Sequence, residues 1–322
     1  MAPHAPVSTL EDAARSAREL KPDVLVSVGG GSTHDTTKGI STLLGEGGKI
    51  SDYQTTFEPP DRIITPKFTS PKVPVIAVST TMGCAELSLG GGFTDFSLGR
   101  KISVQDPGVL PRLILVDGEA LATTPTDILT STAIGELRIA IEAVYSTGHN
   151  PITDSLALGA IGTLARELPR CPEKQLSTLL SLKTACCMAS MANVTGLGLN
   201  TATAHHVGGL YGVPHGVANG ILLPHTMRFN LDACSDRLLL VAEAMGVDIH
   251  GLTEEEAGLA AADRTDGLCR ELGIPRRLRD AGVPEEGLEL IASATLHDRG
   301  LATNPKPVHD AGPIMEVLRQ AW

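Results

Sequence analysis

The chain has 322 residues, 42% of them hydrophobic, and a formal net charge of −11. This length suits one large or two modest domains, and the hydrophobic content is sufficient for a full core. The acidic balance and the lack of any basic cluster argue against nucleic acid and against an anionic membrane surface as partners.

The N-terminal residues 1–7 contain neither a basic nor an apolar stretch, so we expect no secretory signal peptide. The six cysteines show no CxxC pair and no disulfide-like spacing, which indicates reduced thiols. We therefore expect a cytoplasmic protein. Residues 184–227 carry no Asp, Glu, Lys or Arg, but they are too polar for a membrane span and predict the buried centre of a helical domain.

Helix and strand signals alternate in the first third of the chain. The patterns predict helices over 10–20 and 33–44, and strands over 24–28, 75–79 and 113–116. Residues 45–72 are rich in Gly, Pro, Asp and Thr and predict a long loop. Strands separated by helical or loop segments indicate a parallel sheet.

After Asp117 the pattern of apolar residues becomes helical and stays helical to Trp322. We therefore predict two domains, with a boundary near residue 120. Residues 1–120 should form an α/β domain of the dinucleotide-binding type, truncated and built on a parallel sheet. Residues 121–322 should form an all-α domain.

A glycine-rich turn, Gly29-Gly30-Gly31-Ser32, follows the first predicted strand and precedes a helix. Glycine lets backbone approach an anion closely, and a helix N-terminus offers free N–H groups and a partial positive charge. The turn therefore predicts a phosphate cradle, although a strand-to-helix turn without a ligand would have the same composition. It does not match the Rossmann GxGxxG pattern.

The longer run from Gly29 to Lys38 (GGGSTHDTTK) resembles the GGGSxxDxxK signature of the iron-containing alcohol dehydrogenase superfamily. The segments 74–81, 101–111, 113–119, 205–215 and 223–230 also look like family motifs and follow in family order. The segment Asn304-Pro305-Lys306-Pro307 looks most like maleylacetate reductases. The resemblance implies NAD(H) or NADP(H) as cofactor, held by Gly29, Gly30, Gly31, Ser32, Asp35, Lys38, Thr80, Thr81 and Lys101.

The chain departs from this family where metal-dependent members hold their ion. The resemblance places the four family ligands at Gly135, Ile139, Thr201 and His215, of which only His215 can bind a metal. One imidazole does not hold Fe²⁺ or Zn²⁺, which need about three protein ligands. We therefore expect no bound metal, although Glu136, Glu142, His205 and His206 leave a rebuilt site as an alternative.

Two further departures concern the second cofactor loop and the chain's beginning. After Thr80-Thr81, Cys84 and Ala85 replace the Gly and Ser of maleylacetate reductases, and Glu86 matches the family Glu. Cys84 is interpreted as a small buried thiol rather than a nucleophile. Family members also have a strand-helix-strand region before the first helix predicted in this chain. A sheet without those strands would expose an edge, so we expect a homodimer in which the partner subunit covers it.

Three residues are the candidates for catalysis: His205, His215 and Arg138. By resemblance, His205 faces the nicotinamide end of the cleft, and histidine is the commonest acid or base in enzymes. Arg138 lies on the helix of the lost metal ligands and could face the substrate, or it could be a solvated surface residue. His206 and His225 are expected to have structural roles.

The preferred hypothesis is a metal-independent NAD(P)H-dependent reductase of a small activated carbonyl or enone, similar to maleylacetate reductases. The intact glycine signature favours this hypothesis. The alternative is a non-redox enzyme (a lyase, dehydratase, isomerase or cyclase) that reuses the cleft, or a non-catalytic binding protein.

Overall fold

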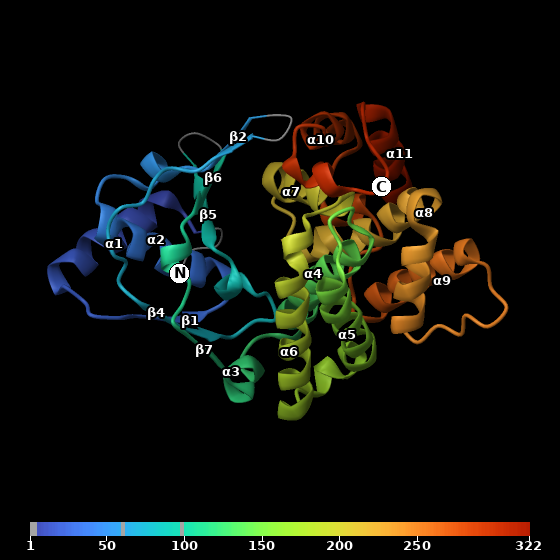
Figure 1. Ribbon diagram of the computed structural model, residues 1–322, viewed down its shortest axis with the longest axis horizontal. Helices are drawn as coiled ribbons and strands as arrows, with labels where there is room; N and C mark the ends of the chain where they lie inside the picture. The colour runs from blue at the N-terminus through green and yellow to red at the C-terminus, as the bar shows by residue number, and fades with distance from the viewer. Residues whose placement is uncertain (1–4, 59–61, 97–99) are drawn as a thin grey trace. The chain divides into compact units, whose positions relative to one another are not determined.

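The computed structural model describes residues 5–58, 62–96 and 100–322. The chain divides into two compact units, Met1–Thr124 and Pro125–Trp322 (Figure 1). The first unit contains a parallel sheet with helices, and the second is helical. The expected combination of an α/β part and an all-α part is therefore confirmed.

A three-stranded parallel sheet forms the centre of the first unit. Its strands are β1 (Leu25–Gly29), β4 (Val75–Ser79) and β7 (Leu113–Val116), in the order β1-β4-β7. All three were predicted from short runs of aliphatic residues. Helix α2 (Gly31–Glu46) packs on the face of the sheet that carries Ser27, Ala77 and Ser79.

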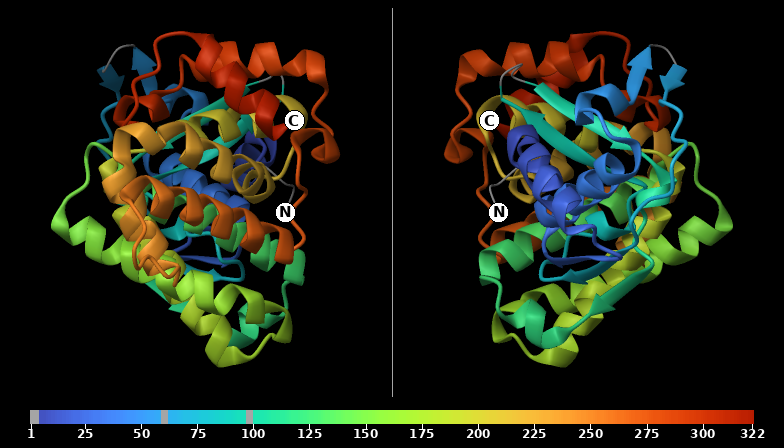
Figure 2. Two further views of the ribbon diagram at one scale, coloured as in Figure 1. Left: turned by 90° about the vertical axis from the view of Figure 1, so that its right-hand side faces the viewer. Right: turned by 90° about the vertical axis from the view of Figure 1, so that its left-hand side faces the viewer.

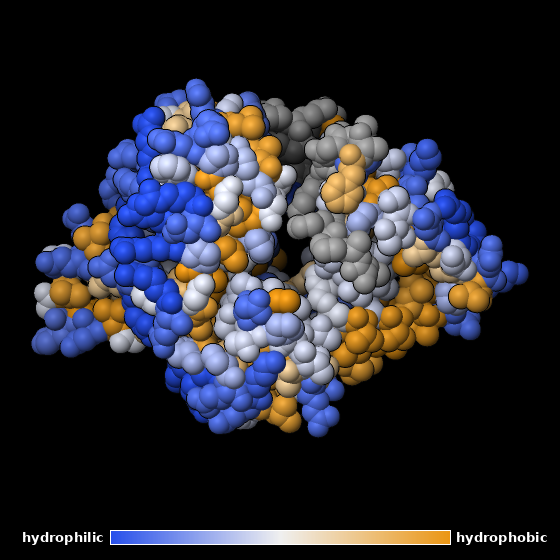
Figure 3. Space-filling model, turned by 180° about the vertical axis from the view of Figure 1, so that it is seen from behind, coloured by the Kyte–Doolittle hydropathy of each residue, from blue (hydrophilic) through white to orange (hydrophobic). Residues whose placement is uncertain are grey.

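The opposite face of this sheet is aliphatic and open to solvent. The strand register aligns Val26 with Ile76 and Leu113 in one row, and Val28 with Val78 and Leu115 in the next. Val26 and Val28 are each 59% exposed. Figure 3 shows hydrophobic residues gathered where this sheet reaches the surface. Parallel sheets are almost always covered on both faces, so this open face is unusual.

The first unit also contains two antiparallel hairpins, and neither was predicted from the sequence. Strands β2 (Thr56–Glu58) and β3 (Arg62–Ile64), with the short helix η1 (Ile50–Tyr53), lie in the segment expected to be a loop. Strands β5 (Gly90–Asp95) and β6 (Arg100–Gln105) form the second hairpin. β5 begins with three glycines. Glycine is depleted in strands, so this part of the sequence carries no strand signal.

Helix α1 (Val7–Leu20) packs beside α2, and the β5–β6 hairpin lies against both helices, as the right-hand view in Figure 2 shows. Their shared core contains Leu10, Leu43, Phe93 and Ile102, all buried. This core fixes the position of α2. The short helices η2 (Ala85–Leu87) and η3 (Pro107–Val109) and helix α3 (Gly118–Ala122) complete the unit.

All residues of the second unit are described, and none of them lies in a strand. Its longer helices are α4 (Thr126–Tyr145), α5 (Pro151–Glu167), α6 (Leu176–Ala192), α7 (Leu199–Tyr211), α8 (His215–Ala244), α9 (Glu254–Glu271), α10 (Leu288–Thr295) and α11 (Ala311–Ala321). Single-turn or short helices connect them: η4 (Leu168–Glu173), η5 (Asn193–Thr195), η6 (Leu278–Ala281), η7 (Glu285–Gly287) and η8 (Arg299–Thr303).

Helices α8 and α9 lie side by side, and α4 packs against α5, α6 and α8 (Figure 2, left). None of the helices in the described residues combines the length and the apolar character that crossing a lipid bilayer requires. The uncharged segment 184–227 extends through α6, α7 and the start of α8, where Asn200, Thr203, Asn219 and Thr226 are fully buried.

Candidate active site

The glycine-rich turn joins β1 directly to the N-terminus of α2. Gly30 is the N-cap residue, and its carbonyl accepts the first helical hydrogen bonds, from the N–H groups of Thr33 and His34. A Cβ atom added to Gly29 would lie 2.5 Å from the Thr33 hydroxyl oxygen. The turn therefore needs glycine for close packing, and it presents a helix N-terminus to which an anion can bind.

The second predicted cofactor loop lies beside this turn. The Thr80 N–H donates to the Gly29 carbonyl at 2.9 Å. A Cβ atom added to Gly30 would lie 2.7 Å from a methyl carbon of Thr81. The fold thus brings together six of the nine predicted cofactor residues: Gly29, Gly30, Gly31, Ser32, Thr80 and Thr81.

Lys38 lies two turns further along α2 and makes its hydrogen bonds within the protein. Its Nζ donates to the carbonyl oxygens of Ala85, Ser88 and Gly90 at 2.5, 2.6 and 3.1 Å. Burial lowers the pKa of Lys38 to about 8, against the opposing effect of the Asp35 and Glu86 carboxylates. The ammonium group therefore holds residues 85–90 against α2, and its role in cofactor binding stays a prediction.

Asp35 has a similar role, because its Oδ2 accepts a hydrogen bond of 3.1 Å from the Gly92 N–H of β5. The signature's Asp and Lys thus both connect α2 to the segment that follows the second loop. Lys101, the ninth predicted cofactor residue, lies on β6 opposite Thr94. Its side chain is outside the described part of the structure.

His34 is a buried polar residue in this unit that the sequence analysis did not select. Its Nδ1 lies 2.7 Å from the Ser27 hydroxyl of β1, and its Nε2 lies 3.4 Å from the Ser79 hydroxyl of β4. Glu86 Oε2 is 3.8 Å from the same Nε2. His34 therefore links the two strands, α2 and the second loop beneath the glycine turn.

In the second unit, the predicted catalytic histidines His205 and His215 lie together. Their rings stack with centroids 5.8 Å apart and an angle of 17° between the ring planes. His205 Nδ1 lies 2.9 Å from Oδ2 of Asp298, and the His205 side chain is 43% exposed. An imidazole held at one nitrogen and exposed to solvent is suited to proton transfer.

Arg138 is part of a buried polar network, and it is only 4% exposed. Its Nη1 donates to the Thr201 hydroxyl and lies 3.4 Å from Oε2 of Glu142. The Thr201 hydroxyl and N–H both donate to the Glu142 carboxylate. The expected alternative of a solvated Arg138 is therefore wrong. Because Thr201 and His205 are one turn apart on α7, the network lies one turn from the histidine pair.

The start of α8 lies very close to α4. A Cβ atom added to Gly216 would lie 1.9 Å from the Ser131 carbonyl oxygen, and one added to Gly135 would lie 3.9 Å from the Gly216 Cα. Only glycine fits at position 216, so the close approach of the two helices fixes where His215 projects. Gly135, Arg138, Thr201, His205 and His215 thus belong to one region of the helical unit.

This region offers few ligands for a metal ion. Gly135 and Ile139 have no ligand atom, and Thr201 is engaged with Arg138 and Glu142. Among residues 125–322, no three His, Cys, Asp or Glu side chains converge into a metal-binding cluster. The guanidinium of Arg138 would also repel a cation at this place. The residues present do not fit the metal that the family resemblance implies.

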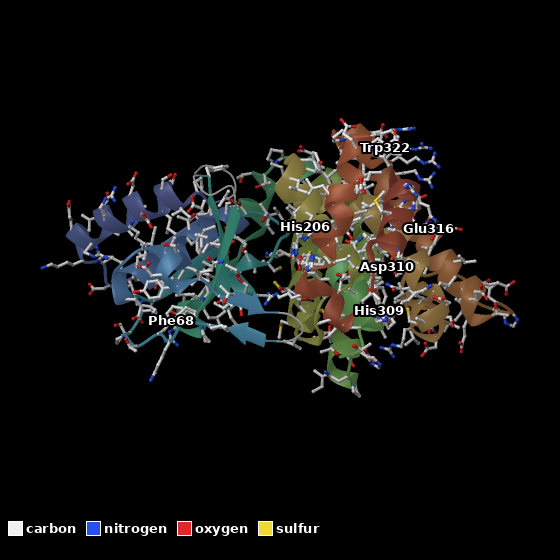
Figure 4. The ribbon with its side chains drawn as sticks, turned by 90° about the horizontal axis from the view of Figure 1, so that it is seen from above. Phe68, His206, His309, Asp310, Glu316 and Trp322 are labelled. Carbon is white, nitrogen blue, oxygen red and sulfur yellow. The ribbon has the colours of Figure 1, made fainter. Side chains whose placement is uncertain are left out.

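The helical unit contains three further polar residues that bear on the predictions: His225, His206 and Asp298. Burial, with a smaller effect of the Arg228 charge, lowers the pKa of His225 to about 4, so this imidazole is neutral at pH 7. His206, labelled in Figure 4, has its Nε2 3.6 Å from Asp298. Asp298 itself was not predicted, because it lies 93 residues from His205 and no local pattern distinguishes it.

Comparison with known proteins identifies relatives along the whole chain. Residues 1–118 match the family model "Iron-containing alcohol dehydrogenase", and residues 130–322 match "Fe-containing alcohol dehydrogenase family, C-terminal". The chain is 33% identical to the NAD-dependent methanol dehydrogenase of Bacillus methanolicus over 303 residues, which are 93% of this chain and 77% of that protein. It is 33% identical to the lactaldehyde reductase of Escherichia coli K12 over 305 residues, with the same coverage of each chain.

Solved structures also resemble this chain along its whole length. A 1,3-propanediol oxidoreductase superposes with a TM-score of 0.92 at 32% identity, covering all of this chain and 82% of the other. The sulfoacetaldehyde reductase of Bifidobacterium kashiwanohense, solved in complex with NAD⁺, superposes with a TM-score of 0.87 at 25% identity and the same coverage.

Proposed function

Because the chain belongs to the iron-containing alcohol dehydrogenase family and is thus an oxidoreductase, we propose that it is a metal-independent, maleylacetate reductase-like enzyme that reduces a small activated carbonyl or enone with NADH or NADPH. One observation supports this proposal most: the β1–Gly30–α2 turn and the Thr80–Thr81 loop meet at a helix N-terminus. That arrangement suits the pyrophosphate of a dinucleotide. The NAD-dependent relative and the NAD⁺ complex agree with it.

The proposed reaction transfers a hydride and a proton. A bound NADH or NADPH would supply the hydride that forms the C–H bond at the carbonyl carbon, with the carbonyl π electrons moving to oxygen. The imidazolium of His205 donates its Nε2 proton to that oxygen, and solvent then reprotonates the ring. Nε2 is available for this proton transfer because, within the described residues, the hydrogen bond of His205 to the protein is made at Nδ1.

The loss of ligand side chains at positions 135, 139 and 201 is the ground for proposing a metal-independent reaction. The family name implies iron, but positions 135, 139 and 201 supply no free donor, and Arg138 places a positive charge among them. Carbonyl polarisation must then come from hydrogen-bond donors. His215 stacks on His205, and Arg138 binds Thr201 one turn before His205 on α7, so these two groups are the proposed donors.

The test is a reductase assay with small aldehydes and enones, following the oxidation of NADH and NADPH. We expect turnover that is unchanged after dialysis against EDTA, with far less than one iron or zinc per chain by elemental analysis. Turnover that EDTA abolishes and Fe²⁺ or Zn²⁺ restores would contradict the metal-independent part. Failure to bind either coenzyme would favour a non-redox function.

We propose in addition that the enzyme works as a homodimer. The open aliphatic face of β1, β4 and β7 supports this, because apolar rows of this kind are stabilised when a second molecule removes them from water. Light scattering at micromolar concentrations should give twice the 33.6 kDa chain mass. Introducing charge with Val26→Lys should shift the mass to that of one chain. A monomeric wild-type protein at these concentrations would refute the proposal.

A further inference from the structure

Asp298 has two separate sets of partners, one for each carboxylate oxygen. Oδ1 accepts a hydrogen bond of 2.7 Å from the Gly300 N–H and caps the short helix η8. Oδ2 lies 2.9 Å from His205 Nδ1 and 3.6 Å from His206 Nε2. The side chain is only 11% exposed. The backbone therefore fixes the carboxylate, and the fixed carboxylate faces two consecutive histidines of α7.

The charge of Asp298 decides how His205 is protonated. Burial alone would raise the pKa of Asp298, but the hydrogen bond and charge of His205, the nearby His206 ring and the hydrogen bond from the Gly300 N–H outweigh it and hold this pKa well below its usual range. An ionised carboxylate can only accept hydrogen bonds. His205 must therefore donate from Nδ1, which leaves Nε2 for another partner.

We propose that Asp298 is a positioning residue for His205: its carboxylate fixes the imidazole's orientation and tautomer so that Nε2 is presented for proton transfer. This inference rests on the proposed reductase function for its catalytic consequence. The physical arrangement is that of other Asp–His pairs, in which the aspartate holds the imidazole in the productive tautomer and stabilises the imidazolium. The stacked ring of His215 limits tilting of His205 from one side.

Asp298→Asn separates the proposed role from the helix cap. Asparagine caps helices as well as aspartate does, so the Gly300 bond and the fold should persist. Its amide would instead donate to Nδ1 and move the ring proton to Nε2. Asp310→Asn is the matched control, because Asp310 Oδ1 caps α11 through the Gly312 N–H in the same way and has no histidine partner among the interactions of the described residues. Figure 4 shows Asp310 apart from His206.

We expect Asp298→Asn to lower kcat. The largest possible loss is the one caused by removing His205 itself, about 10²–10⁴-fold. The Kd for NADH should stay unchanged. Asp310→Asn should have neither effect. In a His205→Ala background, Asp298→Asn should lower kcat no further, because a residue that acts through His205 has nothing left to position. Additive losses in the double variant would overturn the proposal.

A second measurement does not depend on activity. ¹⁵N NMR of the His205 ring, assigned with His205→Gln, should report a protonated Nδ1 in the wild type and a protonated Nε2 in Asp298→Asn. If this change is observed while no carbonyl substrate is reduced, the positioning stands and the proposed function fails. The same Nδ1-protonated ring in both proteins would overturn the positioning whatever the activity.

Discussion

Replacing His205 by alanine should lower kcat about 10²–10⁴-fold, the usual contribution of a general acid or base. No Asp or Glu within residues 184–227 can take over the proton, because that segment contains none. The Kd for NADH should stay unchanged, since His205 lies in the helical unit and the predicted phosphate cradle lies in the α/β unit. Stopped-flow or steady-state turnover, together with thermal melting, measures both quantities.

His225→Ala is the control for this substitution. His225 belongs to the same uncharged segment, but its imidazole is largely buried and has a pKa lowered to about 4, which makes it a poor acid or base at neutral pH. This variant should lower the melting temperature more than the rate. A folded His205→Ala protein with near-wild-type turnover would place the chemistry elsewhere.

Gly30→Val should weaken NADH and NADPH binding about 5- to 150-fold, which corresponds to the roughly 1–3 kcal/mol that overpacking a close contact costs. The first added atom would already lie 2.7 Å from Thr81, so the two loops of the predicted cradle must separate. The added methyl groups would also occupy space next to the helix N-terminus. Fluorescence titration with each coenzyme gives the affinities.

Gly92→Val is the matched change, because no atom lies within 4 Å of a Cβ added at Gly92. It should leave both affinities unaltered and serves as a control for the glycine-to-valine change itself. If Gly30→Val keeps a normal melting temperature and binds both coenzymes with wild-type affinity, the turn is a structural junction rather than a phosphate site.

The strands of the parallel sheet could be predicted because their signal is local. VIAVS and LILV are aliphatic runs, and β4 and β7 begin and end at the predicted residues. The β5–β6 hairpin could not be predicted, since its first residues are Gly90, Gly91 and Gly92. Glycine is required at position 90, where an added Cβ would lie 1.9 Å from the Val104 carbonyl oxygen. The packing of the folded hairpin imposes that requirement, and the sequence alone does not reveal it.

The candidate site likewise contains some features that the sequence predicts and others that it does not. The glycine turn and the stacked pair His205 and His215 follow from motifs along the chain. The roles of Lys38 and Arg138 do not, because each depends on a partner that is distant in sequence: Lys38 binds carbonyls about 50 residues away, and Arg138 contacts Thr201, 63 residues away. Asp298 was missed for the same reason. Long-range hydrogen bonds between side chains leave no periodic signal in a single sequence.

The open face of the β1–β4–β7 sheet also affects how the protein behaves at high concentration. At low ionic strength the net charge of −11 keeps molecules apart. Added salt screens that repulsion within roughly 10 Å at 0.1 M. Sulfate, which is excluded from protein surfaces, then strengthens contact between the aliphatic rows. Salt should therefore tighten the proposed dimer through Val26, Val28, Leu113 and Leu115, and dilute buffers well above the isoelectric point of 5.4 should favour the separate chains.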